Sequence, residues 1–511
     1  MTSDVPTPPA LVAGAPSGLH RAAAVVAPDD LCGAAQELLA GGMRLALVSG
    51  HDDGTVMRVV YLFTSGPPDV RVELHVPVDR ARPEVPTLSG CSFSAGRFER
   101  ELRDLFGIEP VGHPQPRRLV LHQHWPQGWF PFRIDAGPPP EMVDDAGQFP
   151  FVPVAGSGVY EIPVGPVHAG LIEPGHFRFW VVGETILRMK ARLWFVHKGL
   201  ERVFEGRDAR AGVEVAERIS GDTAVGHTLA FCQAVEDARG VDVPDDALVV
   251  RAVLLELERV YNHVADIGAL CNDVGFGIAQ AWALTLREEL LELNGTVTGH
   301  RLLRGGVVPG GARVRRLPGP GELDGIARRF DELVELVGSN AFVRERFAGT
   351  ATLDGTLARD LGLVGPAGRA SGVGFDARTA HPFVEPPPGF APATRHGGDV
   401  LARYEVRVDE VRASLRSIAD LVGRAGSLDA VAGGGGHPSD RSAGGVGIVE
   451  GWRGAIVHRV ELDGERLARV KVVDPSFLNW PGLPVSLADT IVPDFPLANK
   501  SFNLSYAGND L

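Results

Sequence analysis

One segment constrains the fold of this 511-residue chain more than any other, because the stretch from Asp245 to Leu270 repeats its apolar residues with a helical period. A repeat of about 3.6 residues is that of an amphipathic helix with one buried face. It is carried by Leu248, Val249, Ala252, Val253, Leu257, Val260, Tyr261 and Val264. Similar patterns predict further helices over residues 279–293, 321–347 and 399–422. We therefore expect a large, mainly helical domain over residues 156–511, with an up-and-down helical core.

The N-terminal part has a different pattern, typical of a small α/β domain over residues 20–136. It combines a helix-like segment at 29–39, capped by Asp29 or Asp30, with two strand-like runs at 56–63 and 70–76. A second helix is indicated by a shared apolar face that ends at a C-cap glycine. This face consists of Phe98, Leu102, Leu105 and Phe106, followed by Gly107. The fold class is thus α+β, with a disordered tail at 1–19 and a linker at 137–155.

Short strands are expected around the helical region. Runs at 177–182 and 185–190 flank Gly183-Glu184 and predict a tight hairpin. Further strands are expected at 455–462 and 467–473. Residues 425–447 are expected to form a glycine-rich loop. Within it, the four successive glycines from Gly433 to Gly436 lack the lysine and the strand–turn–helix context of a phosphate loop, so we expect a flexible insertion there.

Composition excludes several classes of function. The net charge of −14 argues against a nucleic-acid-binding protein, which needs a basic surface. The apolar runs are too short to span a membrane, and the acidic, proline-containing N-terminus is not that of a signal peptide. Both features indicate a cytoplasmic protein. The four cysteines form no CxxC pair, so a local Fe–S or zinc site is not expected.

Two sets of motifs resemble subunits of respiratory complexes. The N-terminal set resembles the C subunit of NADH-quinone oxidoreductase (complex I). It consists of Glu101-x-x-Asp104-x-Phe106-Gly107-Ile108, Arg117-Arg118-Leu119-x-x-His122 and Trp129-Phe130-Pro131-Phe132-Arg133. Residues 156–511 resemble the D subunit and, more closely, the large subunit of membrane-bound group 4 [NiFe] hydrogenases of the formate hydrogenlyase type. The resemblance implies a fused C/D-type subunit.

The D-type resemblance rests on motifs that follow the same order along the chain. Each motif is short, and the specificity comes from their number and order. They are Gly165-Pro166-Val167-His168, Glu173-Pro174-Gly175-His176-Phe177-Arg178-Phe179, His197-Lys198-Gly199-Leu200-Glu201, Cys271-Asn272-Asp273-Val274-Gly275-Phe276, Thr298-Gly299-His300-Arg301, Arg369-Ala370-Ser371-Gly372 with Asp376 and Arg378, Glu450-Gly451-Trp452-Arg453-Gly454, and Pro475-Ser476-Phe477.

The chain departs from the hydrogenases at the residues that would hold nickel and iron. In that family two CxxC pairs bind the metals, and the matching positions here are Ser220, Thr223, Ser505 and Gly508. Alcohols bind Ni and Fe far more weakly than thiolates, and glycine offers no ligand atom. We therefore expect no metal or other cofactor bound by this chain, and no hydrogenase activity.

The quinone site of the D-type relatives is altered as well. The family's quinone-binding tyrosine falls at Gly221, and its histidine falls near Glu173-Pro174. His168 and His176 are near in sequence and could replace the histidine, and Tyr506 could supply a phenol. With these replacements, the ligand that the resemblance implies is a quinone or another organic acceptor.

We expect a polar pocket where the four metal-binding cysteines of the hydrogenases would lie; we call the four matching positions, Ser220, Thr223, Ser505 and Gly508, the cradle. Its predicted members are His168, Glu173, His176, Arg218, Ser220, Asp222, Thr223, His227, Arg453, Asn503, Ser505 and Tyr506. Glu173 and His176 are the candidate catalytic residues. Glu173 matches the family's proton-relay glutamate, and an apolar environment would raise its pKa so that it could pass protons.

These assignments have structural alternatives. Glu173 could form a buried ion pair with Arg178 or Arg218 instead of relaying protons. His227 could simply pack on its helix, and the two hydroxyl residues of the first pair could fill the vacated space. The sequence leaves both kinds of role open.

The resemblance implies a subunit of an NAD(P)H- or ferredoxin-dependent oxidoreductase complex. In such a complex the chain would accept electrons from an Fe–S small subunit and contact membrane-embedded, antiporter-like subunits that translocate ions. It would lie on the cytoplasmic face of the membrane, held there by its partners. The alternative is a redox-silent scaffold that only links the small subunit to the membrane arm.

Overall fold

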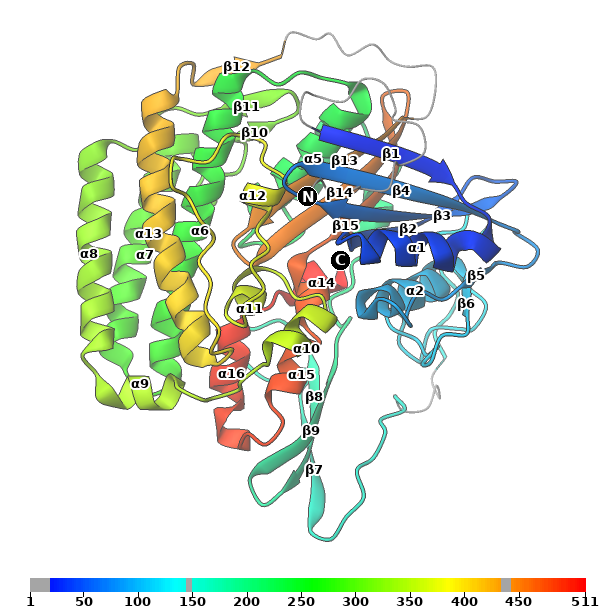
Figure 1. The fold of residues 1–511 in the computed structure, drawn as a ribbon, viewed down its shortest axis with the longest axis horizontal. Helices are drawn as coiled ribbons and strands as arrows, with labels where there is room; N and C mark the ends of the chain where they lie inside the picture. The colour runs from blue at the N-terminus through cyan, green and yellow to red at the C-terminus, as the bar shows by residue number, and fades with distance from the viewer. Residues whose placement is uncertain (1–18, 144–148, 433–442) are drawn as a thin grey trace.

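The N-terminal module is a four-stranded sheet with two helices (Figure 1). The computed structural model describes residues 19–143, 149–432 and 443–511. The elements of the module are β1 (Leu19–Val25), a 3-10 turn (Pro28–Asp30), α1 (Leu31–Ala40), β2 (Arg44–Asp52), β3 (Met57–Ser65), β4 (Asp69–Val78), β5 (Glu84–Pro86), α2 (Phe93–Phe106) and β6 (Glu109–Val111). The sheet order is β1-β4-β3-β2, with β1 parallel to β4 and the other pairs antiparallel.

Several predicted elements of this module are confirmed. The runs at 56–63 and 70–76 form β3 and β4, and α2 ends at Gly107, whose φ of 69° is the left-handed value typical of a C-cap glycine. Asp30 precedes α1, but its side chain makes no capping hydrogen bond, in contrast to the prediction. Leu19 begins β1, and the rest of the predicted tail, residues 1–18, lies outside the described residues.

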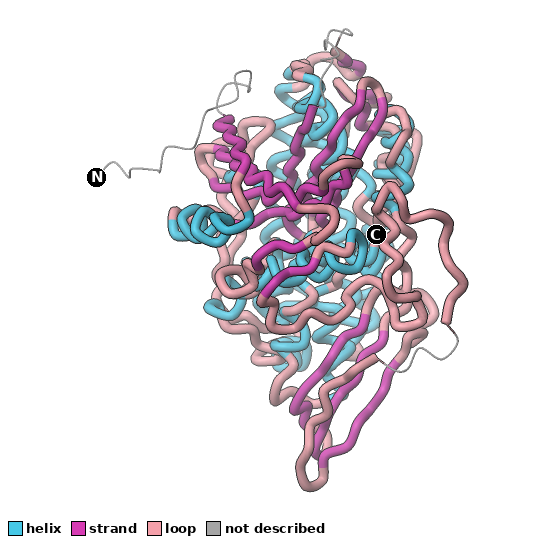
Figure 2. The backbone as a smooth tube through the Cα atoms, turned by 90° about the vertical axis from the view of Figure 1, so that its right-hand side faces the viewer, coloured by secondary structure: helices cyan, strands magenta, loops and turns pink. Residues whose placement is uncertain are grey.

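Strands β5 and β6 form a separate two-stranded sheet, and a three-stranded sheet further along the chain extends away from the body of the protein (Figures 1 and 2). It contains β7 (Val159–Val164), β8 (His176–Val182) and β9 (Thr185–Arg192), all antiparallel. Val182 pairs with Thr185 across Gly183-Glu184, which confirms the predicted hairpin. In the loop between β7 and β8, a Cβ at Gly175 would lie 2.5 Å from the Tyr506 ring, so glycine is needed for this close approach.

Long helices form the side of the protein that faces away from the N-terminal module (Figure 1). The predicted helices over 245–270, 279–293 and 399–422 are confirmed, and the α+β fold class with them. The helix predicted over 321–347 is wrong in one respect, because Asn340 caps a new helix and the segment forms two helices, Pro320–Gly338 and Ala341–Phe347. The elements from the hairpin to the last long helix are α3 (Leu200–Phe204), α4 (Ala209–Ala216), α5 (Ala224–Arg239), α6 (Asp245–Asp273), α7 (Gly277–Thr298), β10 (Val307–Val308), β11 (Gly311–Arg313), α8 (Pro320–Gly338), α9 (Ala341–Phe347), α10 (Gly355–Asp360), α11 (Gly365–Arg369), α12 (Ala377–Ala380) and α13 (Val400–Arg424).

Strand β12 (Asp429–Val431) pairs with β11 in a small sheet of order β10-β11-β12. A three-stranded antiparallel sheet and short helices complete the chain: β13 (Ala443–Gly451), β14 (Gly454–Asp463), β15 (Arg466–Val473), α14 (Pro475–Asn479), α15 (Gly482–Ser486), a 3-10 turn (Val492–Asp494), α16 (Phe495–Phe502) and α17 (Tyr506–Asp510). Helix α5 lies so close to β13 that a Cβ at Gly447 would meet Ala230 O at 1.9 Å. The stretch 425–447 is therefore not all loop, because it includes β12 and the start of β13, while residues 433–442 lie outside the described residues.

Two large apolar clusters, with a small third one at Ala370, Ala402 and Val406, form the core of the described residues. One joins the long helices to one face of the β13–β15 sheet. The other joins the N-terminal module to the β8–β9 hairpin, the other face of that sheet and the C-terminal helices. The N-terminal module thus shares a core with the rest of the protein. In the described part of the chain, no helix has the length and apolar character needed to cross a bilayer.

Candidate functional site

The two cysteine-free segments meet in the structure. Ser220 lies just before α5 and Ser505 is the N-cap of α17, and their Oγ atoms are 2.9 Å apart. Ser505 Oγ also accepts a hydrogen bond from Gly508 N (2.9 Å), and Ser220 Oγ donates to Asp222 (2.8 Å). A direct hydrogen bond between hydroxyl groups therefore joins the two segments, which lie 285 positions apart.

An ion pair between Asp222 and Arg453 lies beside this contact. The two guanidinium NH groups donate to the two carboxylate oxygens at 2.8 and 2.6 Å, and Arg453 Nε donates to Asn503 O at 2.5 Å. The guanidinium also stacks 3.8 Å from the Trp452 ring centroid. Burial opposes ionisation of Asp222, but Arg453 and the hydrogen bond from Ser220 outweigh it and lower the pKa of the carboxyl to about 2. The pair is therefore charged at any physiological pH.

The residues at the cysteine positions do not fit a NiFe centre. Three of them offer hydroxyl groups, which are weak ligands for nickel and iron. The fourth, Gly508, has no room for a side chain, because a Cβ there would lie 2.4 Å from Asp474 Oδ2. Asp474 is held in place by Ser476 N (2.7 Å) and by His227 Nε2 (3.0 Å). Among the described residues, no group of three or more His, Cys, Asp or Glu side chains is arranged to hold a metal ion.

A cavity of about 580 Å³ opens beside the junction. Its wall includes the predicted residues His168, Glu173, Ser220, Asp222, Arg453, Asn503, Ser505 and Tyr506. The Tyr506 hydroxyl lies 3.2 Å from His168 Nε2. Burial raises the pKa of Tyr506 and lowers the pKa of His168, so near neutral pH a phenol lies beside a neutral imidazole.

Glu173 lies at the exposed rim of this cavity, in the loop between β7 and β8. Its carboxylate accepts a hydrogen bond from Ala507 N (2.8 Å) in the first turn of α17. The ion pairs considered for it do not form, because Arg178 pairs with Glu161 and Arg218 lies nearest to Glu217. An exposed carboxylate at the mouth of a cavity can exchange protons with solvent.

Two predicted pocket residues point elsewhere. His176 opens β8, and its Nδ1 lies 3.3 Å from Gly165 O, away from the cavity wall. Arg218 has a side chain that is 54% exposed and donates to Glu214 O at 2.6 Å. The prediction that these two side chains line the pocket is thus not supported by their placement. Each side chain contacts a backbone carbonyl oxygen outside the pocket instead.

Two others are buried behind the cavity wall. Thr223 Oγ1 donates to Asp222 (3.0 Å) and accepts from Trp452 Nε1 (3.1 Å). His227 is fully buried, with its ring nitrogens 3.0 Å from Asp474 and 3.0 Å from His458. Both residues support the site from behind, and His227 does so through contacts with Asp474 and His458 across the folded chain.

The cavity also has members that the sequence patterns do not single out. Asp273, Asn499 and Lys500 line it. Asp273 belongs to the motif that begins at Cys271, so the resemblance contained a signal for it. Burial raises the pKa of Asp273 against the opposing charge of Lys500. Asn499 and Lys500 lie on α16, and only the folded chain brings this helix to the cavity.

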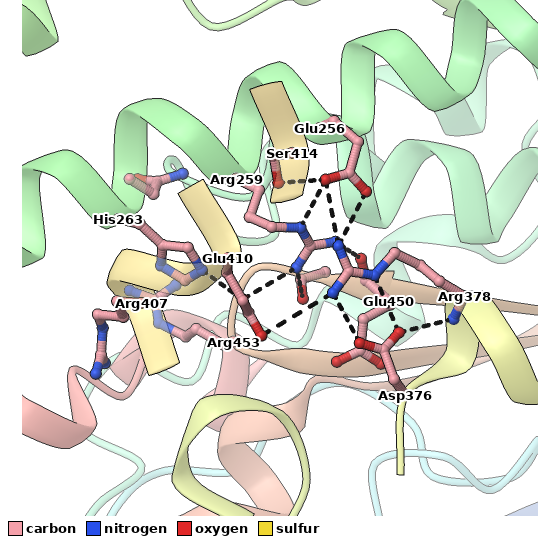
Figure 3. A network of polar contacts seen from close by, with 12 residues as sticks. Glu256, Arg259, His263, Asp376, Arg378, Arg407, Glu410, Ser414, Glu450 and Arg453 are labelled. Atoms are coloured by element: carbon pink, nitrogen blue, oxygen red, sulfur yellow. Dashed lines mark hydrogen bonds and ion pairs between the residues drawn. The ribbon is translucent and has the colours of Figure 1, made fainter. Parts of the chain in front are cut away.

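Buried charged side chains form a network next to Arg453 and His263 (Figure 3). Glu410 lies 2.6 Å from His263 Nε2 and pairs with Arg369, which reaches Glu450 at 2.7 Å. The further members are Glu256, Arg259, Asp376, Arg378 and Ser414. Several of these residues come from the quoted motifs, yet none lines the cavity. This network joins α6, α13 and β13 through buried ion pairs and hydrogen bonds.

Comparison with known families divides the chain in the same way as the motifs. Residues 24–140 match the family described as respiratory-chain NADH dehydrogenase, 30 Kd subunit. Residues 273–431 match the 49 Kd subunit of the same enzyme, and residues 198–271 match nickel-dependent hydrogenase. The matched regions follow one another along one polypeptide.

Individual relatives extend over most of the chain. Formate hydrogenlyase subunit 5 of Escherichia coli is 33% identical, covering 86% of this chain and 79% of that protein. Hydrogenase-4 component G of Escherichia coli is 32% identical, with coverage of 85% and 77%. Among solved structures, a chain from the membrane-bound sulfane sulfur reductase, an archaeal respiratory membrane complex, is similar with a TM-score of 0.63 and 25% identity, covering 69% of this chain and 99% of that one. The chain therefore belongs to the family of formate hydrogenlyase subunit 5, with regions of the 30 Kd and 49 Kd NADH dehydrogenase types joined in one polypeptide.

Proposed function

We propose that this chain is a subunit of a membrane-associated oxidoreductase complex and that its cavity binds an organic electron acceptor, with a quinone as the first candidate. The observation that carries the proposal is the Tyr506–His168 pair on the wall of a 580 Å³ cavity, beside a cradle whose residues do not fit a NiFe centre. The volume lies within the range of small-molecule sites.

The chemistry of the wall suits reduction of a quinone, which takes up two electrons and two protons to give a quinol. The Tyr506 phenol stays protonated because its pKa is raised, so it can donate a hydrogen bond to a quinone oxygen. Such a bond strengthens as charge develops on that oxygen during reduction. Glu173 at the rim and Asp273 in the wall are carboxyl groups that can deliver the protons.

One side of the mouth of the cavity exposes apolar side chains, which supports a ligand with an apolar tail or a contact with a membrane partner. The loop between β7 and β8 exposes Val167 (81%), Leu171 (102%) and Ile172 (36%). Leu171 and Ile172 also line the cavity. Exposed apolar side chains gathered on one loop are typical of an interaction site.

In the proposed complex the electrons come from an Fe–S small subunit, and membrane-embedded antiporter-like subunits couple the reaction to ion translocation. The chain itself lies at the cytoplasmic face of the membrane and is held there by these partners. The names of its relatives, which include subunits of hydrogenlyase and NADH-quinone oxidoreductase complexes, support this arrangement.

The test is acceptor reduction by the purified complex carrying Tyr506→Phe. We expect a drop in kcat of about tenfold or more, equivalent to ~1.4 kcal/mol of lost transition-state stabilisation. The matched control is Tyr160→Phe, since Tyr160 is a half-exposed tyrosine whose hydroxyl donates to Gly183 O, away from the cavity. Glu173→Gln keeps the acceptor for Ala507 N but cannot transfer a proton, so it should slow turnover as well.

The competing account is the redox-silent scaffold. It predicts that the wild-type complex reduces no acceptor, or that Tyr506→Phe and Glu173→Gln change only assembly. Either result would refute the proposed reaction. Assembly is followed in the same preparations by size-exclusion chromatography, so that a loss of turnover is separated from a loss of subunits.

A further inference from the structure

A second cavity, of about 380 Å³, lies between the N-terminal module and the β8–β9 hairpin. It shares no lining residue with the cavity at Tyr506. Among the described residues that line it there is no aspartate or glutamate, but there are six basic side chains: Arg97, Arg100, Arg117, Arg188, Lys190 and Arg192. Such a concentration of positive charge is unexpected in a chain with a net charge of −14.

Two regular elements place most of these charges. Side chains at every second position of a strand point to the same face, so β9 presents Arg188, Lys190 and Arg192 together. Arg97 and Arg100 are three positions apart on α2 and share a helix face. Arg188 is exposed at the open end of the cavity, whereas Arg192 is only 5% exposed.

The six basic side chains have no carboxylate partner within the described ranges. Arg100 donates to the carbonyl oxygens of Arg117 (2.7 Å) and Arg118 (2.8 Å), and Arg192 donates to those of Leu119 and Leu121. The buried Nε atoms of Arg97, Arg117 and Arg192 have no hydrogen-bond partner. Backbone carbonyls orient these groups but do not neutralise them, and buried charge without a counterion is costly.

The neighbouring positive charges act on Lys190, which lies between Arg188 and Arg192 on the same face of β9. Burial, together with Arg117, Arg100 and Arg97, lowers the pKa of Lys190 to about 7. Burial and the neighbouring Arg117 also lower the pKa of Arg100 to about 10. An anion in the cavity would reverse these shifts, because it supplies the charge that the protein does not.

Aromatic rings hold several guanidinium groups in place. Arg192 lies 5.0 Å from the ring centroid of Phe149, and Arg117 lies 5.8 Å from the same ring. Arg97 and Arg192 lie 5.7 and 5.8 Å from the ring of Trp194. Cation–π contacts of this kind fix the donors without consuming their N–H groups. The cavity is thus ordered before any ligand arrives.

We propose that this cavity binds a small molecule that carries two or more phosphate groups. Arginine forks match phosphate oxygens in geometry and charge, and a diphosphate carries enough negative charge to balance several guanidinium groups at once. The volume suits a small ligand. Inorganic diphosphate and nucleoside diphosphates share this chemistry, and Phe93, which is 45% exposed at the cavity, offers a ring on which a base could stack.

The test is isothermal titration calorimetry of the full chain with inorganic diphosphate and with ADP, at about physiological ionic strength because ion pairs are screened by salt. We expect one site per chain. Arg188→Gln with Lys190→Gln should weaken binding at least tenfold, since neither side chain donates a hydrogen bond within the described structure that folding would lose. Arg416→Gln removes the same kind of charge from an exposed position on α13, and should leave the affinity within twofold of the wild type.

The two ligands distinguish a nucleotide from inorganic diphosphate as the source of the bound phosphate groups. Tighter binding of ADP than of diphosphate assigns a nucleotide, and equal binding assigns the diphosphate group alone. The proposal is overturned if neither ligand binds at about millimolar concentration, if the double variant binds like the wild type, or if Arg416→Gln weakens binding as much as the double variant does.

Lys190 provides a second readout. The groups that face it are Arg97 and Arg100 from α2, Arg117 from the following loop and Arg188 on its own strand, all of them positive. Near pH 8 the lysine of the ligand-free chain is mostly neutral, because its pKa is about 7. A bound anion should raise this pKa, and Lys190 should therefore take up a proton when the ligand binds. This uptake is measured as the dependence of the binding enthalpy on the buffer, and Lys190→Gln should abolish the Lys190 contribution. An unchanged proton uptake in that variant would contradict the proposed position of the ligand.

Discussion

Gly508 has no room for a side chain in the folded chain, and Gly508→Ala tests this requirement. Gly508 lies within α17, where alanine would normally stabilise a helix by about 0.5–1 kcal/mol relative to glycine. In the folded chain, however, the added Cβ would lie 2.4 Å from Asp474 Oδ2 and 2.5 Å from its Cγ. Asp474 is buried and cannot move without losing its contacts to His227 and Ser476.

The expected cost follows from these contacts. Forcing an extra carbon into a close-packed site costs about 1–3 kcal/mol. Displacing the carboxylate weakens its hydrogen bond to His227, and hydrogen bonds to charged groups contribute about 1.5–3 kcal/mol. Against the small gain in helix propensity, we expect Gly508→Ala to lower the free energy of unfolding by about 2–5 kcal/mol.

The assay is urea unfolding of the full chain, compared with Gly221→Ala. Gly221 follows Ser220 of the cradle, but a Cβ there meets no atom within 4 Å, so this control should stay within about 0.5 kcal/mol of the wild type. In an Asp474→Ala background the clash is absent, and Gly508→Ala should then be neutral or stabilising. The reasoning is refuted if Gly508→Ala is as stable as Gly221→Ala, or if its cost is the same in both backgrounds.

Two further predictions concern the same junction. Ser505→Ala removes the N-cap bond to Gly508 N and the contact with Ser220, and should lower the free energy of unfolding by about 0.5–2 kcal/mol in urea; no change would contradict the described contact. Burial raises the pKa of Glu258 to about 8, so the folded chain keeps a proton that the unfolded chain loses, and stability should fall by up to ~1.4 kcal/mol per pH unit between about pH 5 and 8. Glu258→Gln should flatten this slope in urea titrations at several pH values, and an equal slope would show that Glu258 is not the group responsible.

The sequence predicted the fold best where local periodicity was strong. Helices α6 and α13 repeat apolar residues over many turns, and the β8–β9 hairpin has an unambiguous turn at Gly183-Glu184. Strands β1 and β2 were missed, since β1 is held by a parallel pairing with β4 that is 50 positions away in sequence. The three-residue strand β12 is too short to give a periodic signal.

For the site, the resemblance brought the right segments together but did not orient every side chain. His227 lies four positions after Thr223, yet its ring contacts Asp474, which is 247 positions further along the sequence. Asp474 itself carries no local signal, because its role depends on the approach of Gly508 across the folded chain. The cavity with six basic side chains could not be predicted from the sequence for the same reason. Arg97 and Arg192 carry no local signal, and only the packing of the N-terminal module on the hairpin brings them together.

We infer that the chain is part of an oxidoreductase complex that works without nickel at the position where the hydrogenases of this family bind it. The most direct test is the nickel content of a purified complex that still reduces an organic acceptor, determined by mass spectrometry of the metal. The donor set predicts a nickel-to-chain ratio close to zero in the active preparation, because hydroxyl groups, a glycine and the Asp222–Arg453 pair occupy the site. A ratio near one nickel per chain that rises and falls with activity would contradict the claim.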